Sequence, residues 1–109
     1  MPSYLVQVSY TQQALSALIA NPQDRSQALK KNVRNLGGKV TSSWFSFGEY
    51  DLLMIAEFPD NVSAAAWALA VAAGGALKSV KTTPLLSIEE GLEALKKAPE
   101  SGYKSIVAS

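Results

Sequence analysis

The sequence contains neither cysteine nor histidine, and both absences restrict the chemistry that is open to the protein. Without cysteine there is no disulfide bond and no thiolate ligand for a metal. Without histidine the chain lacks the commonest general base, the commonest metal ligand and the usual protein ligand of haem iron. An all-oxygen magnesium or calcium site stays open, but the acidic residues are too scattered to indicate one. We therefore expect no metal, no cofactor and no histidine-based catalytic triad.

A strong charge of one sign is also missing, because ten basic and nine acidic residues leave a formal net charge of +1. Nucleic-acid binding needs a clustered excess of Lys and Arg. The one local cluster, Lys30, Lys31 and Arg34, falls on an expected helix and is typical of a solvated helix face. We expect no nucleic acid among the partners.

Long hydrophobic runs are absent as well. Residues 61–77 carry no charge, but they are dominated by Ala and end in Gly74 and Gly75, so they predict a helix packed closely on a sheet. The first four residues lack the basic start and apolar centre of a signal peptide. We therefore expect a cytoplasmic protein that does not engage a membrane.

What the sequence does have is a series of short periodic segments that fits one domain of 109 residues. The apolar pattern of strands occurs in the segments 4–10, 39–47, 52–58 and 77–86. The pattern of helices occurs in the segments 11–20, 22–36, 61–73 and 88–98. Asn21-Pro22 divides the first two helices, and we expect Asn21 to cap a helix that begins at Pro22.

This order of elements predicts an α+β, ferredoxin-like βαββαβ fold with one antiparallel four-stranded sheet. The helices are expected on one face, with an additional C-terminal helix. The nearly continuous apolar segment 52–58 indicates a central strand, and Pro84 marks the last strand as an edge. We assign residues 1–98 to the domain and residues 99–109 to a flexible tail.

The face of the sheet that carries no helix is expected to be mixed in character. Its residues from the first and third strands are predicted to be Leu5, Gln7, Ser9, Leu53, Ile55 and Glu57. From the second strand, Val40, Ser42 and Trp44 are predicted to share one side. Such a surface is too apolar for water and too polar for a sealed core. A second copy packed face to face would cover it and leave polar groups to line a shared cavity.

The sharpest motif is the segment 44–51, which reads Trp-Phe-Ser-Phe-Gly-Glu-Tyr-Asp. With the apolar strand that ends Phe58-Pro59-Asp60, it resembles the GYD domain family of small bacterial and archaeal proteins. The likeness covers about residues 3–95 and includes the Leu-Gly-Gly helix end at 36–38, the Ala-rich helix and the Ser-Ile-Glu-Glu helix start at 87–90.

The resemblance implies a fold similar to that of the dimeric α/β-barrel proteins, which associate through their sheets. It therefore implies that the main partner of the chain is a second copy, in a homodimer or a higher oligomer. The family has no established activity, so the resemblance supplies no reaction.

Seven residues are candidates for binding a small molecule: Gln7, Ser9, Trp44, Glu49, Tyr50, Asp51 and Glu57. In the turn, two carboxylates beside a phenol could position a substrate or act as acid and base, although Gly and Asp are also what a hairpin turn requires. Trp44 could stack on a flat ligand or fill a dimer core. Gln7, Ser9 and Glu57 could hydrogen-bond a ligand or one another.

The missing catalytic signature favours a binding function, in which a homo-oligomer holds a small metabolite in a cavity at the sheet-to-sheet interface. Two alternatives stay open. One is a cofactor-independent monooxygenase or isomerase, by analogy with other proteins of this fold. The other is a structural or assembly protein. A cavity of about 300 Å³ or more with polar lining would favour binding or catalysis over assembly.

Overall fold

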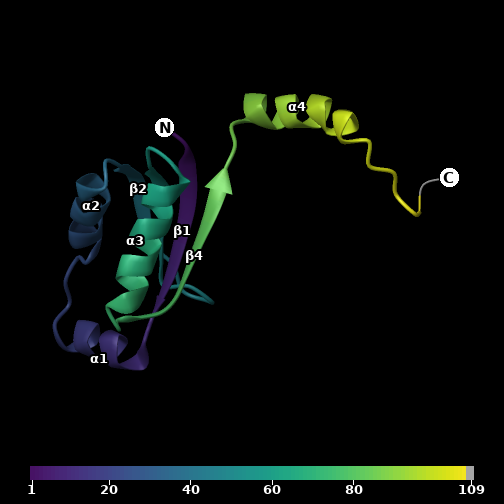
Figure 1. The fold of residues 1–109 in the computed structure, drawn as a ribbon. Coiled ribbons are helices and arrows are strands. Elements are labelled where there is room, and N and C mark those ends of the chain that lie inside the picture. The colour runs from purple at the N-terminus through teal and green to yellow at the C-terminus, as the bar shows by residue number, and fades with distance from the viewer. Residues whose placement is uncertain (108–109) are drawn as a thin grey trace.

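The secondary structure of the computed structural model, which describes residues 1–107, follows the predicted order (Figure 1). The strands are β1 (Ser3–Tyr10), β2 (Lys39–Phe45), β3 (Leu52–Glu57) and β4 (Leu77–Leu85). The helices are α1 (Gln12–Ala20), α2 (Ser26–Asn35), α3 (Asn61–Ala73) and α4 (Ile88–Lys97), followed by a short 3-10 helix at Ala98–Ser101.

The strands form one antiparallel sheet in the order β2-β3-β1-β4, which confirms the predicted ferredoxin-like α+β fold. The apolar strand β3 is central, as its composition predicted. The strand that contains Pro84 lies at an edge, where its missing N–H breaks no ladder. Helices α2 and α3 pack against one face of the sheet (Figure 1). The opposite face is hereafter called the bare face.

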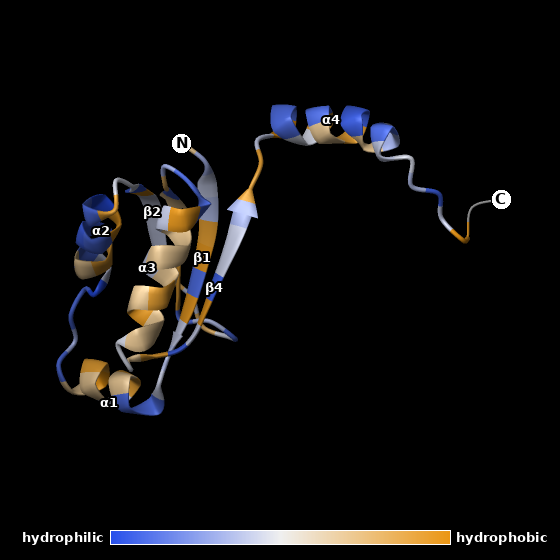
Figure 2. Ribbon diagram, in the orientation of Figure 1, coloured by the Kyte–Doolittle hydropathy of each residue, from blue (hydrophilic) through white to orange (hydrophobic). Residues whose placement is uncertain are grey.

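The core lies between the sheet and these two helices. Strand β3 and strand β1 as far as Val8 bury every second residue, and Figure 2 shows the alternation of hydrophobic and hydrophilic colour along β1. Phe58 lies edge-on to Tyr4, with ring centroids 5.6 Å apart, and 6.4 Å from the Trp67 ring. The buried core residues are Tyr4, Val6, Val8, Val33, Leu52, Met54, Ala56, Phe58, Ala64 and Trp67.

One predicted face is wrong, and a bulge in β2 is the reason. Val40 pairs with Ala56 on the helix side, whereas Ser42 and Trp44 lie on the bare face. The pairing register shifts between Val40 and Ser42, and one extra residue in a strand reverses the alternation of its side chains. Ser42 and Trp44 therefore share a face as predicted, but Val40 does not.

The second helix begins at Ser26, later than the predicted start at Pro22. The Asp24 carboxylate accepts hydrogen bonds from the Ser26 backbone N–H at 2.9 Å and from its hydroxyl at 2.5 Å. These hydrogen bonds hold the pKa of Asp24 below its ordinary value. The local turn leaves residues 21–25 as a linker between α1 and α2.

Helix α4 stands apart from the body of the molecule (Figure 1). It begins with the predicted capping box, in which Ser87 and Glu90 exchange hydrogen bonds of 2.9 and 3.0 Å. The radius of gyration is 17.5 Å, whereas a compact chain of this length would have about 13 Å. The predicted tail 99–109 begins in the 3-10 helix, and residues 108–109 lie outside the described part of the chain. The flexibility of the tail and the domain end at residue 98 stay predictions.

Gly38 is the position where the close approach of α2 and β3 leaves no room for a side chain. A Cβ there would collide with the Glu57 carbonyl oxygen and lie 2.8 Å from Val33 Cγ1. We expect Gly38→Ala to lower the free energy of unfolding by about 3 kcal/mol, because the obstructing atom is backbone in a central strand.

Gly74→Ala is the matched control, since its nearest atom would be at 3.4 Å and its φ of −73° suits alanine. Urea unfolding of both variants measures the difference. Equal destabilisation by the two substitutions would contradict the packing argument.

Candidate functional site

The structure separates the seven predicted site residues into two groups. Gln7, Ser9, Trp44 and Glu57 lie on the bare face, on three different strands. The other three, Glu49, Tyr50 and Asp51, lie in the turn between β2 and β3 at one end of the sheet.

The pairing register arranges the bare face in rows across the sheet, read here from β2 to β4. These rows are Trp44–Leu53–Gln7–Lys81, Ser42–Ile55–Leu5–Thr83 and Lys39–Glu57–Ser3–Leu85. In the first two rows the central strands contribute the apolar residues Leu53, Ile55 and Leu5 and the polar Gln7, and charged residues stand toward the margins. Trp44 is 62% exposed, so its indole lies open on this face. The predicted mixture of apolar and polar groups is confirmed.

Ser9 has a partner within the sheet. Its hydroxyl lies 2.6 Å from the Ser79 hydroxyl of β4, and the residue is buried. Of the two roles that the sequence left open for Ser9, cross-strand hydrogen bonding is therefore the one that the structure displays.

Asp51 attaches the turn to the end of β1. Its carboxylate accepts the Tyr10 backbone N–H at 2.8 Å, and its own N–H donates to the Val8 carbonyl at 2.9 Å. Its carbonyl accepts the Ser46 N–H at 2.9 Å, while the Ser46 hydroxyl donates to the Tyr50 carbonyl at 2.7 Å. Asp51 thus connects the start of β3 to the end of β1 and to Ser46 after β2, and its carboxylate makes one of these hydrogen bonds.

Three adjoining cavities lie on the other side of the sheet, among the helices, and the sequence did not point to them. The largest has a volume of ≈ 720 Å³ and lies between α1, α2, α3 and the start of β4. The two smaller cavities have ≈ 270 Å³ each. Tyr10, Leu18 and Gln23 line all three.

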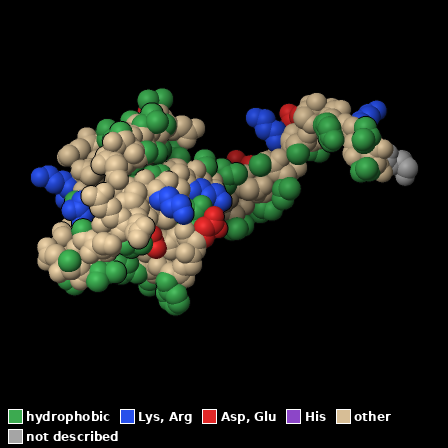
Figure 3. Space-filling view, turned by 90° about the horizontal axis from the view of Figure 1, so that it is seen from below, with side chains coloured by type: hydrophobic (Ala, Val, Ile, Leu, Met, Phe, Trp, Pro, Cys, Tyr) green, Lys and Arg blue, Asp and Glu red, His purple; other side chains and the backbone are tan. Residues whose placement is uncertain are grey.

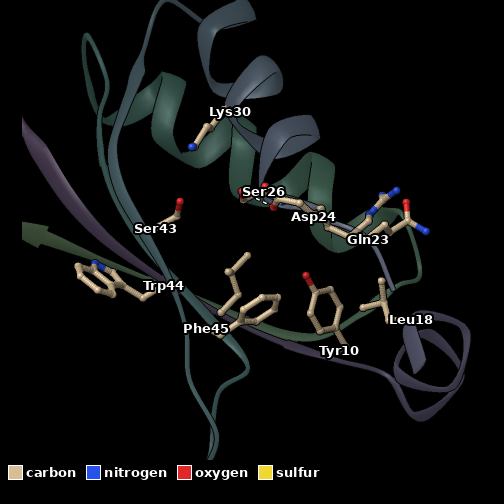
Figure 4. Close-up of a pocket in the computed structure, with 11 residues that line it drawn as sticks. Tyr10, Leu18, Gln23, Asp24, Ser26, Lys30, Ser43, Trp44 and Phe45 are labelled. Atoms are coloured by element: carbon tan, nitrogen blue, oxygen red, sulfur yellow. Dashed lines mark hydrogen bonds between the residues drawn. The ribbon is translucent and has the colours of Figure 1, made fainter. Parts of the chain in front are cut away.

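Figure 4 shows one of the smaller cavities. The Tyr10 hydroxyl points toward Asp24 and Ser26 at the start of α2, and the Phe45 ring lies beside it. The Trp44 indole points to the opposite side of β2. The sheet therefore separates the helix-side cavities from the bare face.

Tyr10 is buried at the centre of these cavities, and its electrostatic surroundings favour the neutral phenol. Burial raises the pKa of Tyr10, and the nearby Asp51 and Asp24 carboxylates raise it further, while Arg25 acts in the opposite direction. The hydroxyl therefore remains a hydrogen-bond donor throughout the neutral range.

Residues 1–107 contain no group of three or more acidic side chains close enough together to hold a metal ion. Among the helices of this part of the chain, none has the length and apolar character to cross a membrane.

Removal of the Asp51 side chain tests whether its hydrogen bond to the end of β1 stabilises the fold. We expect Asp51→Ala to lower the free energy of unfolding by about 2 kcal/mol, because the Tyr10 N–H then loses its acceptor in a largely buried position. Glu49→Ala, two residues away on an exposed side chain, should change stability by less than about 0.5 kcal/mol. Guanidinium unfolding measures both, and an unchanged midpoint for Asp51→Ala would contradict the assignment.

Comparison with known proteins agrees with this architecture. No protein with a curated description matches the sequence. A solved structure, the crystal structure of FFRP-DM1, superposes with a TM-score of 0.50 over 79% of this chain and 100% of that chain, at 13% sequence identity. At this identity the likeness shows the fold alone. The sequence pattern of the GYD domain matches residues 4–95, from the start of the first strand to the last helix. The chain therefore belongs to the GYD domain family.

Proposed function

We propose that this protein works as a homodimer whose two bare faces pack against each other and hold a small metabolite between the sheets. The observation that carries the proposal is the open apolar surface of the first row, where the exposed Trp44 stands beside Leu53 on a face with no helix. A surface of this kind usually marks an interaction site.

The bare face can form part of a dimer interface, but it is too small to form a stable interface without additional surface. Strand rise and spacing give it about 20 Å along the strands and about 19 Å across them. The projected area of about 400 Å² is below the 800 Å² or so that each partner buries in a standard interface. Side-chain relief enlarges this area, and α4 can supply the rest.

Helix α4 offers the additional apolar surface. Ile88, Leu92 and Leu95 recur at helical spacing and are 83%, 51% and 71% exposed. Figure 3 shows hydrophobic side chains along the arm that α4 forms beside the body. A ten-residue helix is marginal in water without tertiary contacts, so this stripe requires a packing partner. In the proposed dimer, α4 lies against the second subunit.

The polar groups of the bare face suit a ligand that is partly flat and partly hydrogen-bonding. Gln7 stands in the same row as Trp44, and Glu57 stands two residues beyond Ile55 on β3. Between two sheets these groups would lose water, and each buried polar group then needs a partner. Trp44 supplies an aromatic platform for the ligand, and Gln7 and Glu57 supply hydrogen bonds. An interface packed without a cavity would instead favour a pure assembly protein.

A charge placed in either surface should break the dimer. We expect Leu53→Glu and Leu92→Glu each to shift the protein from two-chain to one-chain mass in size-exclusion chromatography with light scattering, because an unpaired carboxylate would be buried on association. Leu69→Glu is the matched control, since Leu69 is 72% exposed on α3 and faces away from both surfaces. A monomeric wild-type protein would contradict the proposal.

Native mass spectrometry of the protein purified from its own host tests the ligand. We expect the mass of two chains with a small-molecule adduct, and we expect Trp44→Ala to lose the adduct because the stacking platform is gone. Phe47→Ala is the control, because it removes an aromatic ring that is even more exposed and lies in the turn, and it should keep the adduct. A dimer that never carries an adduct would favour assembly over binding.

A further inference from the structure

The largest cavity is a separate site that does not depend on association of the sheets. It lies among the helices, on the opposite side of the sheet from the bare face, and its volume is ≈ 720 Å³. Ligand pockets in proteins commonly have about 300–1,000 Å³, so a small organic molecule fits.

The cavity exists because its walls are made of small residues. Helix α3 presents Ala70 and Gly74, and α1 presents Ala14 and Ala17. None of these side chains extends far enough to fill the space between the two helices. The late start of α2 adds to this space, because residues 21–25 form a linker instead of another helical turn.

The interior of the cavity is mainly apolar. Leu18, Leu29, Leu36, Val71 and Leu77 complete the wall around the small residues. Pockets lined mainly by hydrophobic side chains suit ligands whose body is hydrocarbon or aromatic. The body of a ligand here is therefore apolar.

Two buried donors also belong to this cavity. Trp67 lines it and is 1% exposed, and its Nε1–H has no hydrogen-bond partner in the described residues. Tyr10 lines it as well and is 9% exposed. An unsatisfied buried donor costs about 1–3 kcal/mol, so the Trp67 Nε1–H is an unpaired polar group in the wall of this cavity.

The cavity has one charged lining residue, Arg25, in the linker before α2. Arg25 is exposed, so its guanidinium stands at the rim rather than in the interior. The neighbouring Asp24 carboxylate is hydrogen-bonded to Ser26. Asn32 and Asn35 on α2 add two amide groups to the lining. The polar part of a ligand is therefore expected to be anionic and to lie near Arg25.

We infer that this cavity binds an apolar monocarboxylic acid, with its hydrocarbon body among α1, α2 and α3 and its carboxylate at Arg25. The guanidinium can hold a carboxylate by two parallel hydrogen bonds. The Asn32 and Asn35 amides offer further donors, and the apolar wall excludes ligands that are charged along their length. This site is independent of the proposed dimer and of the residues on the bare face.

Decanoate, used below its micelle concentration, is a suitable probe, and the two tryptophans of the chain report where it binds. We expect decanoate to shift the Trp67 indole N–H resonance in a saturable manner and to leave the Trp44 resonance unchanged, because Trp44 lies on the other side of the sheet. A shift of the Trp44 resonance alone would overturn the inference and place binding on the bare face.

Two pairs of measurements test the parts of the site. Arg25→Gln should weaken decanoate binding about tenfold in calorimetry, as expected when a charge-assisted hydrogen bond is lost, and decan-1-ol should bind wild type and variant equally. Ala70→Leu should block binding by filling the cavity, whereas Ala72→Leu, an exposed α3 residue outside the lining, should not. Equal affinities for acid and alcohol, or binding unaffected by Ala70→Leu, would refute the assignment.

Discussion

Trp67 is the one large side chain by which α3 is packed onto the sheet, and the two candidate binding surfaces depend on this arrangement. Its ring contacts the core beside Phe58, which in turn lies edge-on to Tyr4 of β1. The other fully buried residue of α3 is Ala64, and the partly buried Ala68 and Val71 are also smaller than Trp67, so the helix lies close to the sheet at Ala64 and leaves space beyond Trp67. With all the helices of the core on that side, the opposite face of the sheet keeps its apolar residues open. The packing of the helices on one side of the sheet thus leaves a cavity among the helices and leaves the bare face uncovered.

Much of the fold was predictable because local patterns and tertiary packing agree. The apolar run of β3 indicated a central strand, and Pro84 could be tolerated only at an edge. The bulge in β2 was not predictable, because one extra residue in the pairing changes no local pattern and is decided by the partner strand. The start of α2 was missed for another reason. Asn21-Pro22 is a good helix start by itself, but the side chain of Asp24 bonds Ser26 and forms a competing turn.

The candidate site also has one part that local sequence patterns predict and another part that depends on tertiary packing. Period-two alternation was enough to place Gln7, Ser9 and Glu57 on one face, because a strand offers only two sides. The helix-side cavity could not be found this way, since it depends on the distance between α1 and α3. Its only trace in the sequence is the abundance of alanine, which is equally consistent with close packing. The distance of α3 from its neighbours is set by the large side chain that packs into the core, and here that side chain is Trp67.

The turn motif and the cavities are connected through Tyr10. The Asp51 carboxylate accepts the Tyr10 backbone N–H, and the Tyr10 side chain lines all three cavities. Asp51, the last residue of the Gly-Glu-Tyr-Asp sequence, therefore acts as a positioning residue, because it fixes the backbone from which the Tyr10 side chain projects. The same strand directs Gln7 to the bare face, on the other side of the sheet. Strand β1 thus contributes side chains to both surfaces, and a shift at its end would move Tyr10 while the paired centre of the strand, with Gln7, stayed in place.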